Sequence, residues 1–350
     1  MREEPVPRLA ALATATPRFD IGQADVEAFA GEIFADMPYG FERFAPVFAN
    51  AAIETRHSSA PIEWYGEEHG LADRNALYVE SALDLLEEAA TNALDEAGLA
   101  PDQIDAIVTV SSTGIATPSL DARLMGRLAF RDDVERTPIF GLGCAGGVLG
   151  LSRAAAIAKS DPEARVLLLV VELCGLTFRR QDMSKSNLVA TALFGDGAAA
   201  AIISCKGDGP RLGPWGEHTW TDSLDVMGWD VADDGLKVLF SRDIPTIVRH
   251  DLRGVVDAFL RRHNLSVAQL DGYIPHPGGA KVLDALEDVL DLERGDLVTA
   301  REALRDHGNM SAATVLFILR AALDEGLHGR HLMTTLGPGF TTGFMLVEAQ

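Results

Sequence analysis

Cysteine is scarce in this sequence. The 350 residues include three cysteines, Cys144, Cys174 and Cys205, an odd number without the spacing of a disulfide framework. Such a framework is therefore excluded as the basis of the fold, and reduced thiols in a cytoplasmic setting are expected. The sequence also has no CxxC pair and no HxxxH spacing, so the patterns typical of a zinc site are missing and no metal is expected.

Long apolar runs are missing as well, and basic residues are in the minority. No stretch approaches the roughly 18 to 20 apolar residues that span a bilayer, and the acidic, proline-broken N-terminus does not resemble a signal peptide. There are 30 Lys and Arg against 52 Asp and Glu, a formal net charge of −22. This charge argues against nucleic acid or an anionic membrane as the main partner, so local cations must meet any anionic substrate.

The chain has what a large folded core requires. Hydrophobic residues make up 47% of the sequence, and 350 residues are enough for two domain-sized halves. Apolar periodicity predicts helices over 71–99, 120–130, 148–159, 245–263, 280–290 and 311–325. Buried β-branched runs predict strands over 105–112, 165–173, 198–203, 271–275 and 344–348, and another that begins at 137.

This alternation of helices and strands predicts an α/β protein with βαβ units and a mainly parallel sheet. A segment rich in Gly and Pro, 206–214, separates two halves, 1–205 and 206–350. The same rhythm occurs in both halves, which indicates a coarse structural duplication without a sequence repeat.

Cys144 is the candidate nucleophile. It lies in Gly141-Leu-Gly-Cys-Ala-Gly-Gly147, between a predicted strand and a predicted helix. A thiol at a helix N-terminus faces unpaired N–H groups, which favour the thiolate, and the glycines allow a substrate to approach the main chain. A buried structural cysteine beside a tight turn is the alternative interpretation.

His276 and Asn309 are the candidate partners of this thiol. His276 ends a predicted strand with proline on both sides and two glycines after it, whereas the other eight histidines lack such a context. Asn309 precedes a predicted helix, where it could equally serve as an N-cap. Together a thiol, an imidazole and a primary amide form a Cys–His–Asn arrangement.

Five segments in order resemble the type III polyketide synthases, the chalcone synthase family of the thiolase superfamily. The match runs from about Leu71 to the C-terminus and rests on Gly143-Cys-Ala-Gly146, Ala192-Leu-Phe-Gly-Asp-Gly-Ala-Ala199, His276-Pro-Gly-Gly279, Gly308-Asn-Met-Ser-Ala312 and Gly337-Pro-Gly-Phe340. The resemblance implies a layered αβαβα fold of two duplicated halves, a homodimer, and CoA thioesters as substrates without any further cofactor.

The resemblance also implies roles for single residues. Cys144 would carry the acyl group, and His276 and Asn309 would complete the triad. Phe194 would separate a CoA tunnel from the cavity, and Ser311 follows the asparagine as it does in the family.

Further residues are expected around the cavity and its opening. Those matched to the cavity wall are Glu172, Cys174, Thr177 and Gly228, and Thr117 falls where plant enzymes have a Met that reaches across the dimer. Arg56 and Gly279 are expected to bind CoA, although a solvated surface arginine is the other interpretation of Arg56.

The implied chemistry is decarboxylative condensation. Loss of CO₂ from malonyl-CoA generates a carbanion, so the site must stabilise an enolate oxygen rather than supply a strong base. The stretch around Glu172 and Gly228 resembles bacterial enzymes that make alkylpyrones or alkylresorcinols from medium- or long-chain fatty acyl-CoA. A malonyl-CoA-only synthase, an initiating ketoacyl-ACP synthase and a silent scaffold paralogue stay open as alternatives.

Overall fold

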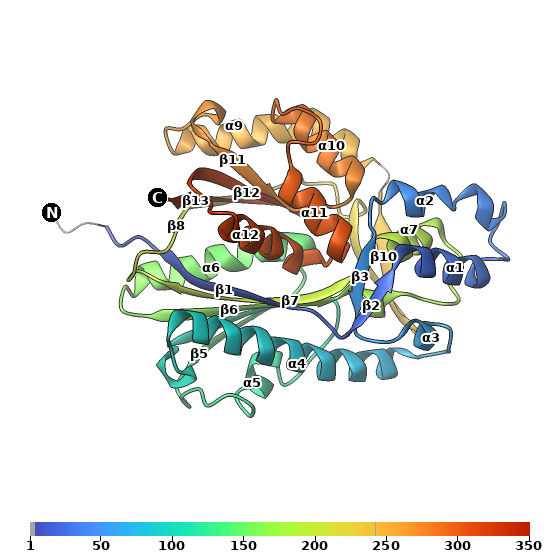
Figure 1. Cartoon of the computed structure of the whole chain (residues 1–350), viewed down its shortest axis with the longest axis horizontal. Coiled ribbons are helices and arrows are strands. Elements are labelled where there is room, and N and C mark those ends of the chain that lie inside the picture. The colour runs from blue at the N-terminus through green and yellow to red at the C-terminus, as the bar shows by residue number, and fades with distance from the viewer. Residues whose placement is uncertain (1–3, 242) are drawn as a thin grey trace.

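The computed structural model describes residues 4–241 and 243–350 and arranges them in five layers. In Figure 1, helices α9 (Arg253–Arg262) and α10 (Ala280–Val289) cover one section of sheet, and α4 (Leu71–Ala97) and α5 (Leu120–Leu124) cover the other. Helices α6 (Gly146–Ser160) and α12 (Thr314–Asp324) lie between the two sections. The predicted αβαβα fold is confirmed. Residues 1–3 of the predicted N-terminal half lie outside the described residues.

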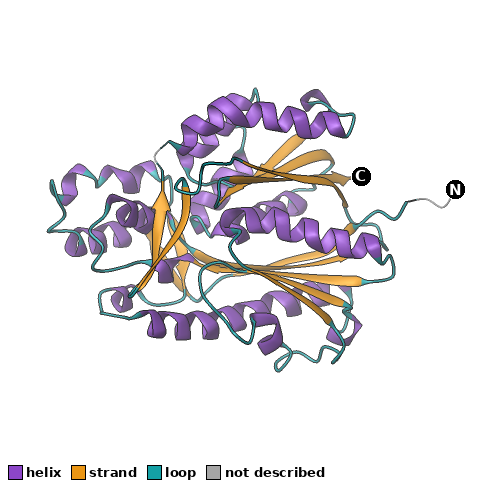
Figure 2. Cartoon of the chain, turned by 180° about the vertical axis from the view of Figure 1, so that it is seen from behind, coloured by secondary structure: helices purple, strands orange, loops and turns teal. Residues whose placement is uncertain are grey.

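Nine strands form the sheet, in the order β11-β12-β13-β8-β1-β7-β6-β4-β5. The first section consists of β1 (Arg8–Ala15), β7 (Asp196–Ser204), β6 (Arg165–Leu173), β4 (Ala106–Val110) and β5 (Glu135–Ile139). The second consists of β11 (Gly272–Pro275), β12 (Gly329–Gly337), β13 (Thr341–Ala349) and β8 (Arg211–Thr219). One residue pair, Arg8 with Arg211, joins β1 to β8, and Figure 2 shows the two sections as separate groups of strands with helices between them.

The prediction of a mainly parallel sheet is wrong, because the sheet is mixed. Strand β4 is parallel to β5 and β6, and β11 is parallel to β12, whereas β7, β8 and β13 pair antiparallel with their neighbours. A parallel neighbour needs a connection that crosses the sheet. The chain between β6 and β7 stays at one end, so Asp196 begins β7 opposite Leu173, where β6 ends.

The chain from β2 to α3, helix α7 and the β9–β10 hairpin form a side unit that sequence periodicity does not predict. It contains β2 (Phe19–Gly22), α1 (Gln23–Ile33), α2 (Pro46–Asn50), β3 (Thr55–Ser58), α3 (Ile62–Tyr65), α7 (Lys185–Leu193), β9 (Met227–Ala232) and β10 (Gly235–Phe240). In Figure 1 this unit lies at the end of the sheet opposite the chain termini. Four of these elements have four or five residues, too few to show a clear periodicity.

The predicted helices are present with shifted ends. Helix α4 ends at Gly98, whose φ of 64° closes it as expected, while α5 is shorter than predicted. The predicted helix over 245–263 consists of α8 (Ile244–Ile247), a π-helical turn (Val248–Leu252) and α9. Helix α11 (Val298–His307) was not predicted. None of the helices in the described residues is both long enough and apolar enough to cross a membrane.

The middle layer depends on a close approach between two helix beginnings. A Cβ atom on Gly147 would lie 2.3 Å from the carbonyl oxygen of Ala312, and one on Gly146 would lie 2.6 Å from Val110 Cγ1. Neither position tolerates a side chain, so glycine lets the start of α6 lie directly against the turn that precedes α12. This contact brings a segment of the first half and a segment of the second half to the same point.

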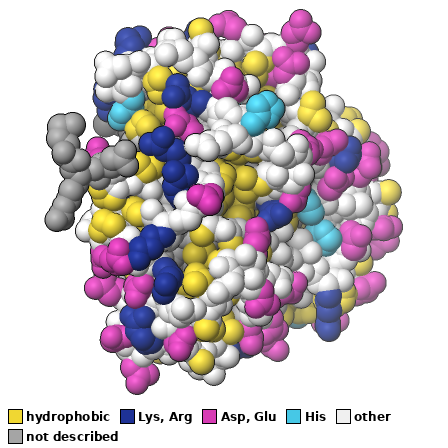
Figure 3. Space-filling model, turned by 60° about the vertical axis from the view of Figure 1, so that its left-hand side comes forward, with side chains coloured by type: hydrophobic (Ala, Val, Ile, Leu, Met, Phe, Trp, Pro, Cys, Tyr) yellow, Lys and Arg dark blue, Asp and Glu magenta, His cyan; other side chains and the backbone are white. Residues whose placement is uncertain are grey.

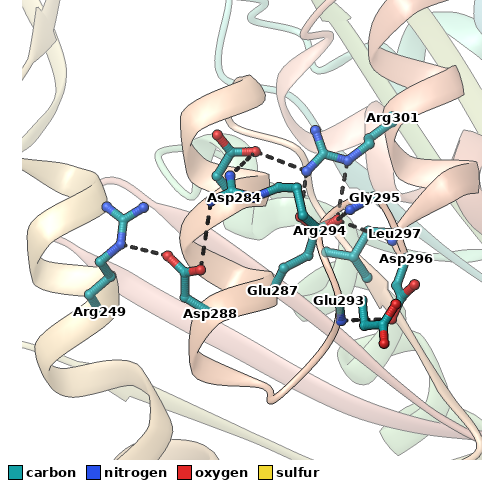
Figure 4. A network of polar contacts seen from close by, with 10 residues as sticks. All are labelled: Arg249, Asp284, Glu287, Asp288, Glu293, Arg294, Gly295, Asp296, Leu297 and Arg301. Carbon is teal, nitrogen blue, oxygen red and sulfur yellow. Dashed lines mark hydrogen bonds and ion pairs between the residues drawn. The ribbon is translucent and has the colours of Figure 1, made fainter.

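Ion pairs connect the helices of the outer layer. Figure 4 shows Glu287 of α10 at the centre of a polar network that includes Arg301 of α11. The Glu287 side chain is fully buried and accepts hydrogen bonds from Arg301 and from the backbone N–H groups of Gly295 and Leu297. At the edge of the network, Arg249 pairs with Asp288 in a more exposed position.

Many other arginines also pair with carboxylates on the surface. Arg153, Arg320 and Arg330 each bind a glutamate. Figure 3, which turns the end with the chain termini forward, shows Lys and Arg side chains among the Asp and Glu side chains. The negative charge is therefore an excess over a mixed surface rather than a uniform acidic coat.

Replacing Arg301 by Met should lower the free energy of unfolding by about 3 kcal/mol, because it leaves a buried carboxylate without its cation. Urea unfolding followed by circular dichroism measures this change. The matched control is Arg249→Met, which removes a partly exposed pair and should change the free energy by less than about 1 kcal/mol. Equal effects of the two variants would contradict the central role of Glu287.

Candidate active site

Cys144 lies at the start of the middle layer. It occupies a short 3₁₀ turn, Gly143–Ala145, that continues directly into α6, and its side chain is buried. Gly143 has a φ of 45°, and a Cβ atom on it would lie 2.6 Å from Pro338 Cδ. The glycine-rich turn thus lets the nucleophile pack against the β12–β13 turn of the second half. The helix N-terminus supplies a positive potential at the thiol.

His276 and Asn309 come from the second half. His276 follows β11, and its backbone N–H donates to the carbonyl of Thr334 at 2.8 Å. Its ring is buried, and neither Nδ1 nor Nε2 has a hydrogen-bond partner among the described residues. Asn309 follows α11 after Gly308, whose φ is 68°. An imidazole with two free nitrogens in a buried position is available for a substrate.

Ser311 and a chain of hydrogen bonds connect the three residues. The Ser311 side chain lies close enough to the Cys144 thiol to lower its pKa, and the Ser311 N–H donates to Asn309 Oδ1 at 2.8 Å. Asn309 Nδ2 donates to the carbonyl of Gly278 at 3.4 Å, and the Gly278 N–H donates to the carbonyl of His276 at 3.2 Å. The structure therefore brings Cys144, Ser311 and Asn309 together and connects Asn309 to the backbone of His276.

Burial opposes the charged form of each catalytic group alone. It raises the pKa of the Cys144 thiol to about 12 and lowers the pKa of His276 to about 3. Each group by itself is therefore neutral at pH 7. A thiolate and an imidazolium would stabilise each other if the thiol proton moved to the ring, which is the step proposed below.

Glu172 lies beside this pair. Its carboxyl group is fully buried and accepts hydrogen bonds from the N–H of Ser112 at 3.0 Å and the hydroxyl of Thr113 at 2.9 Å. Burial raises the pKa of Glu172 to about 7, and its charge disfavours the Cys144 thiolate. Its second oxygen, Oε1, lacks a hydrogen-bond partner among the described residues.

Two other residues expected in the cavity wall line an apolar pocket. The pocket has a volume of about 70 Å³ and lies between α1, β3, α7 and the turn after β6, with Cys174, Thr177 and Phe194 in its wall. Phe194 packs edge-on against Trp229 and against Phe240, with ring centroids 6.0 and 5.7 Å away. Ile21, Val26, Phe29, Ile62 and Phe178 make up much of the remaining surface.

Thr177 also lines a second, smaller pocket. Its other walls include Thr113, Ile115, Leu236 and Gly235, the first residue of β10. Gly228 lies in neither pocket, and a Cβ atom on it would have no neighbour within 4 Å. The expected role of Gly228 in limiting the cavity stays a prediction, while Gly175 and Gly195 line the larger pocket and Gly114 and Gly235 line the smaller one.

Thr117 and Gly279 lie apart from these pockets. Thr117 is exposed, in the loop after β4. Gly279 is buried at the start of α10 with a φ of 151°, a conformation that favours glycine. Their expected roles, at a dimer contact and in CoA binding, stay predictions.

Arg56 is largely enclosed by protein. Its side chain is 5% exposed, its guanidinium donates to the carbonyls of Thr191, Ala192 and Phe194, and it forms part of the wall of the larger pocket. The interpretation of Arg56 as a solvated surface residue is therefore wrong, and its expected role in CoA binding stays a prediction.

Sequence reasoning missed the polar residues that support the site. Ser112 and Thr113 hold Glu172, and Gln23 hydrogen-bonds Arg56. The Ser111-Ser-Thr113 run at the end of a predicted strand was an available signal for the first two, because polar residues there lie at the edge of the sheet. No signal in the sequence distinguishes Gln23 from other polar residues of α1.

The arrangement can perform acyl transfer and stabilise an enolate. The thiol could act as a nucleophile, the imidazole could accept its proton, and the Asn309 amide could donate a hydrogen bond to a developing oxyanion. No cluster of three or more His, Cys, Asp or Glu suited to a metal ion is present in the described parts of the chain.

Comparisons with known proteins agree with this geometry. Residues 46–207 match the N-terminal domain of the chalcone and stilbene synthases, and residues 220–349 match the C-terminal domain. A putative chalcone synthase of Bacillus subtilis is 40% identical over 352 residues, covering 96% of both chains. A 1,3,6,8-tetrahydroxynaphthalene synthase of Streptomyces peucetius is 39% identical, covering 97% of this chain and 92% of the relative.

A solved structure is also similar along its whole length. The crystal structure of 1,3,6,8-tetrahydroxynaphthalene synthase from Streptomyces coelicolor superposes with a TM-score of 0.93 at 31% identity. The superposition covers 98% of this chain and 99% of the other.

The variant His276→Ala should slow alkylation of Cys144 by iodoacetamide at pH 7 at least about 100-fold, since the buried thiol then has no proton acceptor. Because the thiol pKa is about 12, the variant's rate should rise with pH up to at least pH 10. The variant Cys144→Ala gives the background rate of alkylation at Cys174 and Cys205. A rate at pH 7 equal to that of the unmodified protein would contradict the thiol–imidazole pairing.

Proposed function

We propose that this protein extends a medium- or long-chain fatty acyl starter on Cys144 with malonyl-CoA and closes the product to an alkylpyrone or alkylresorcinol. The proposal starts from the family: the chain belongs to the chalcone and stilbene synthases and is a type III polyketide synthase. Membership of this family sets aside the ketoacyl-ACP synthase and the scaffold paralogue. The open question is therefore the starter.

The choice of a medium- or long-chain starter is supported by the apolar space next to Cys174 and Thr177. Cys174 and Thr177 border the larger pocket, whose lining is mainly aliphatic and aromatic with Arg56, His57, Ser58 and Thr191 as further polar members, and Thr177 also borders the second pocket. Burial of each CH₂ group contributes about 0.8 kcal/mol. An acyl tail that passes this wall would gain affinity with every added carbon until the space is filled.

The reaction begins with acyl transfer. His276 takes the proton of the Cys144 thiol as sulfur attacks the thioester carbon of the starter, and CoA leaves as its thiol. Malonyl-CoA then loses CO₂, and the electron pair of the broken C–C bond passes to an enolate. Hydrogen bonds from the His276 ring and the Asn309 amide stabilise the enolate oxygen.

Condensation completes each cycle. The enolate carbon attacks the acyl carbon on Cys144, and the thiolate leaves. The lengthened chain, now on CoA, returns to the cysteine for another cycle or closes on itself. The chemistry needs CoA thioesters and calls for neither a metal nor a redox cofactor.

CoA phosphates need cations, and Arg43 and Lys185 supply two on one side of the molecule. Both are exposed, and neither pairs with a carboxylate among the described residues. Lys185 stacks over Phe44, the neighbour of Arg43, and it begins α7, the helix that ends at Phe194. We therefore place the phosphates beside the start of α7 rather than at Arg56.

A homodimer is part of the proposal. Strand β5 forms an open edge of the sheet, and Phe140 after it and Ile115 after β4 are 63% and 51% exposed. Because β4 and β5 are parallel, the loops that follow them meet at one end. A second copy that covered this edge would also cover Thr117. A cytoplasmic location fits the free thiols.

A malonyl-CoA-only synthase is the second candidate. Two of the similar proteins above are tetrahydroxynaphthalene synthases, which favours a small polyhydroxylated product. In that case the apolar pockets would hold the growing polyketide rather than an alkyl tail.

Incubation with malonyl-CoA and acyl-CoA starters of graded length should give alkylpyrones or alkylresorcinols, identified by mass spectrometry. The catalytic efficiency kcat/KM should rise with starter length before it levels off, because each carbon adds buried apolar surface. Cys144→Ala should abolish every product. A polyhydroxylated aromatic formed from malonyl-CoA alone, with no effect of added starters, would support the second candidate instead.

Replacing Thr177 by Leu should shorten the preferred starter, because the larger side chain fills the boundary shared by both pockets. We expect kcat/KM for the longest starter to fall at least about tenfold while short starters are nearly unaffected. Gly228→Leu is the matched control, since it adds the same side chain outside both pockets. An equal effect of both substitutions would contradict the proposed path of the tail.

Lys185→Glu should raise the KM for acyl-CoA about five- to tenfold with little change in kcat, because a repulsive charge replaces an attractive one near the phosphates. Steady-state kinetics at low ionic strength measures this. The increase should shrink at high salt. An unchanged KM would remove Lys185 from the proposed CoA site.

A further inference from the structure

Arg56 of β3 binds the end of α7. Its guanidinium donates to three carbonyl oxygens, those of Thr191 at 2.8 Å, Ala192 at 3.0 Å and Phe194 at 2.9 Å. These are carbonyls of the last helical turn and of the residue just after it, which have no partner within a helix. A cation at a helix C-terminus also interacts favourably with the helix dipole.

The end of α7 is in turn connected to Asn309 by two backbone hydrogen bonds. The Asn309 N–H donates to the carbonyl of Leu193 at 2.8 Å, and the Gly195 N–H donates to the carbonyl of Asn309 at 3.1 Å. The backbone of Phe194 thereby pairs with that of Asn309 as a short parallel bridge. A displacement of this end of α7 would move the Asn309 backbone with it.

The contact leaves no free space. A Cβ atom on Gly195 would lie 2.2 Å from the carbonyl oxygen of His307, and one on Gly308 would lie 2.9 Å from that of Leu193. Two segments packed this closely shift together rather than independently.

Gln23 of α1 supports the arginine. It accepts a hydrogen bond from Arg56, and its Nε2 donates to the carbonyls of Phe48 at 3.0 Å and Ala192 at 3.1 Å. Both side chains are buried. The N-terminal side unit therefore reaches the end of α7 through two polar side chains.

We propose that Arg56 is a positioning residue for decarboxylation: it fixes the end of α7, and through that end it holds the Asn309 amide where the enolate oxygen forms. This inference rests on the proposed role of Asn309. The side unit contributes none of the triad residues, yet in this inference it controls the position of one hydrogen-bond donor of the triad, the Asn309 amide.

The chemistry of the side chain fits this role. A guanidinium has five donors in a planar fork, so it can bind several carbonyls at once, whereas a lysine ammonium would lose some of them. Burial lowers the pKa of Arg56 to about 10, which leaves the group charged at neutral pH.

The test separates two steps of the reaction in Arg56→Met. In the absence of a starter, malonyl-CoA loses CO₂, and the resulting enolate takes up a proton to become acetyl-CoA. In the proposed mechanism this decarboxylation requires Asn309. Acylation of Cys144 by a starter requires the thiol and His276. We expect decarboxylation to slow about tenfold, because one oxyanion donor is misplaced rather than removed, and acylation to change less than about twofold. Both rates are taken per folded molecule.

The controls address stability and the role of Asn309 separately. Arg301→Met should destabilise the protein without changing the ratio of the two rates. Arg56→Lys, which keeps the charge and fewer of the hydrogen bonds, should fall between Arg56→Met and the unmodified protein, and it replaces Arg56→Met if that variant does not fold. Asn309→Ala should slow decarboxylation more than Arg56→Met.

Three results would count against the inference in different ways. If the two rates fall in proportion in Arg56→Met, as in a partly unfolded enzyme, the positioning role is overturned. A higher KM for both thioesters with an unchanged kcat would instead restore Arg56 as a CoA ligand. If Asn309→Ala decarboxylates malonyl-CoA normally, the proposed role of Asn309 fails whatever Arg56 does.

Discussion

The contact between Gly147 and Ala312 is the constraint on which the site depends. Two helices begin at this point, one from each half of the chain, and a single added carbon on Gly147 would meet a backbone oxygen at 2.3 Å. Because α6 starts there, Cys144 lies at its N-terminus, and because α12 starts there, Ser311 reaches the thiol. The position of the nucleophile is thus a property of how the halves pack, rather than of its own loop.

The same burial that builds the site makes its charges costly. A thiol with a raised pKa and an imidazole with a lowered one would stabilise each other if they ionised as a pair, and the fully buried Glu172 adds a third titratable group at the same place. The proposed mechanism therefore moves protons within the site. A substrate carbonyl that enters it meets donors that water does not weaken.

The sequence indicates the candidate residues more readily than their surroundings. Cys144, His276 and Asn309 stand out because each lies in a glycine-rich segment with few structural explanations, and their catalytic roles stay proposals. The burial of Arg56 is not predicted, because it depends on contacts with α7, more than a hundred residues away, and no local pattern records them. Gly228 and Gly235 look alike in sequence, and only the structure shows that Gly235 lines one of the two pockets and Gly228 neither. The mixed sheet was missed because strand direction depends on where a connection runs, which periodicity does not encode.

The division of the triad between the two halves has a consequence for the synthesis of the protein. Cys144 precedes β7, the last strand of the first section, whereas His276 and Asn309 follow β8, the first strand of the second. As the chain leaves the ribosome, the Cys144 thiol emerges long before the His276 imidazole and the Asn309 amide. If these residues act as proposed, a growing chain cannot consume acyl-CoA, and activity begins only when translation is nearly complete and the second half has folded onto the first.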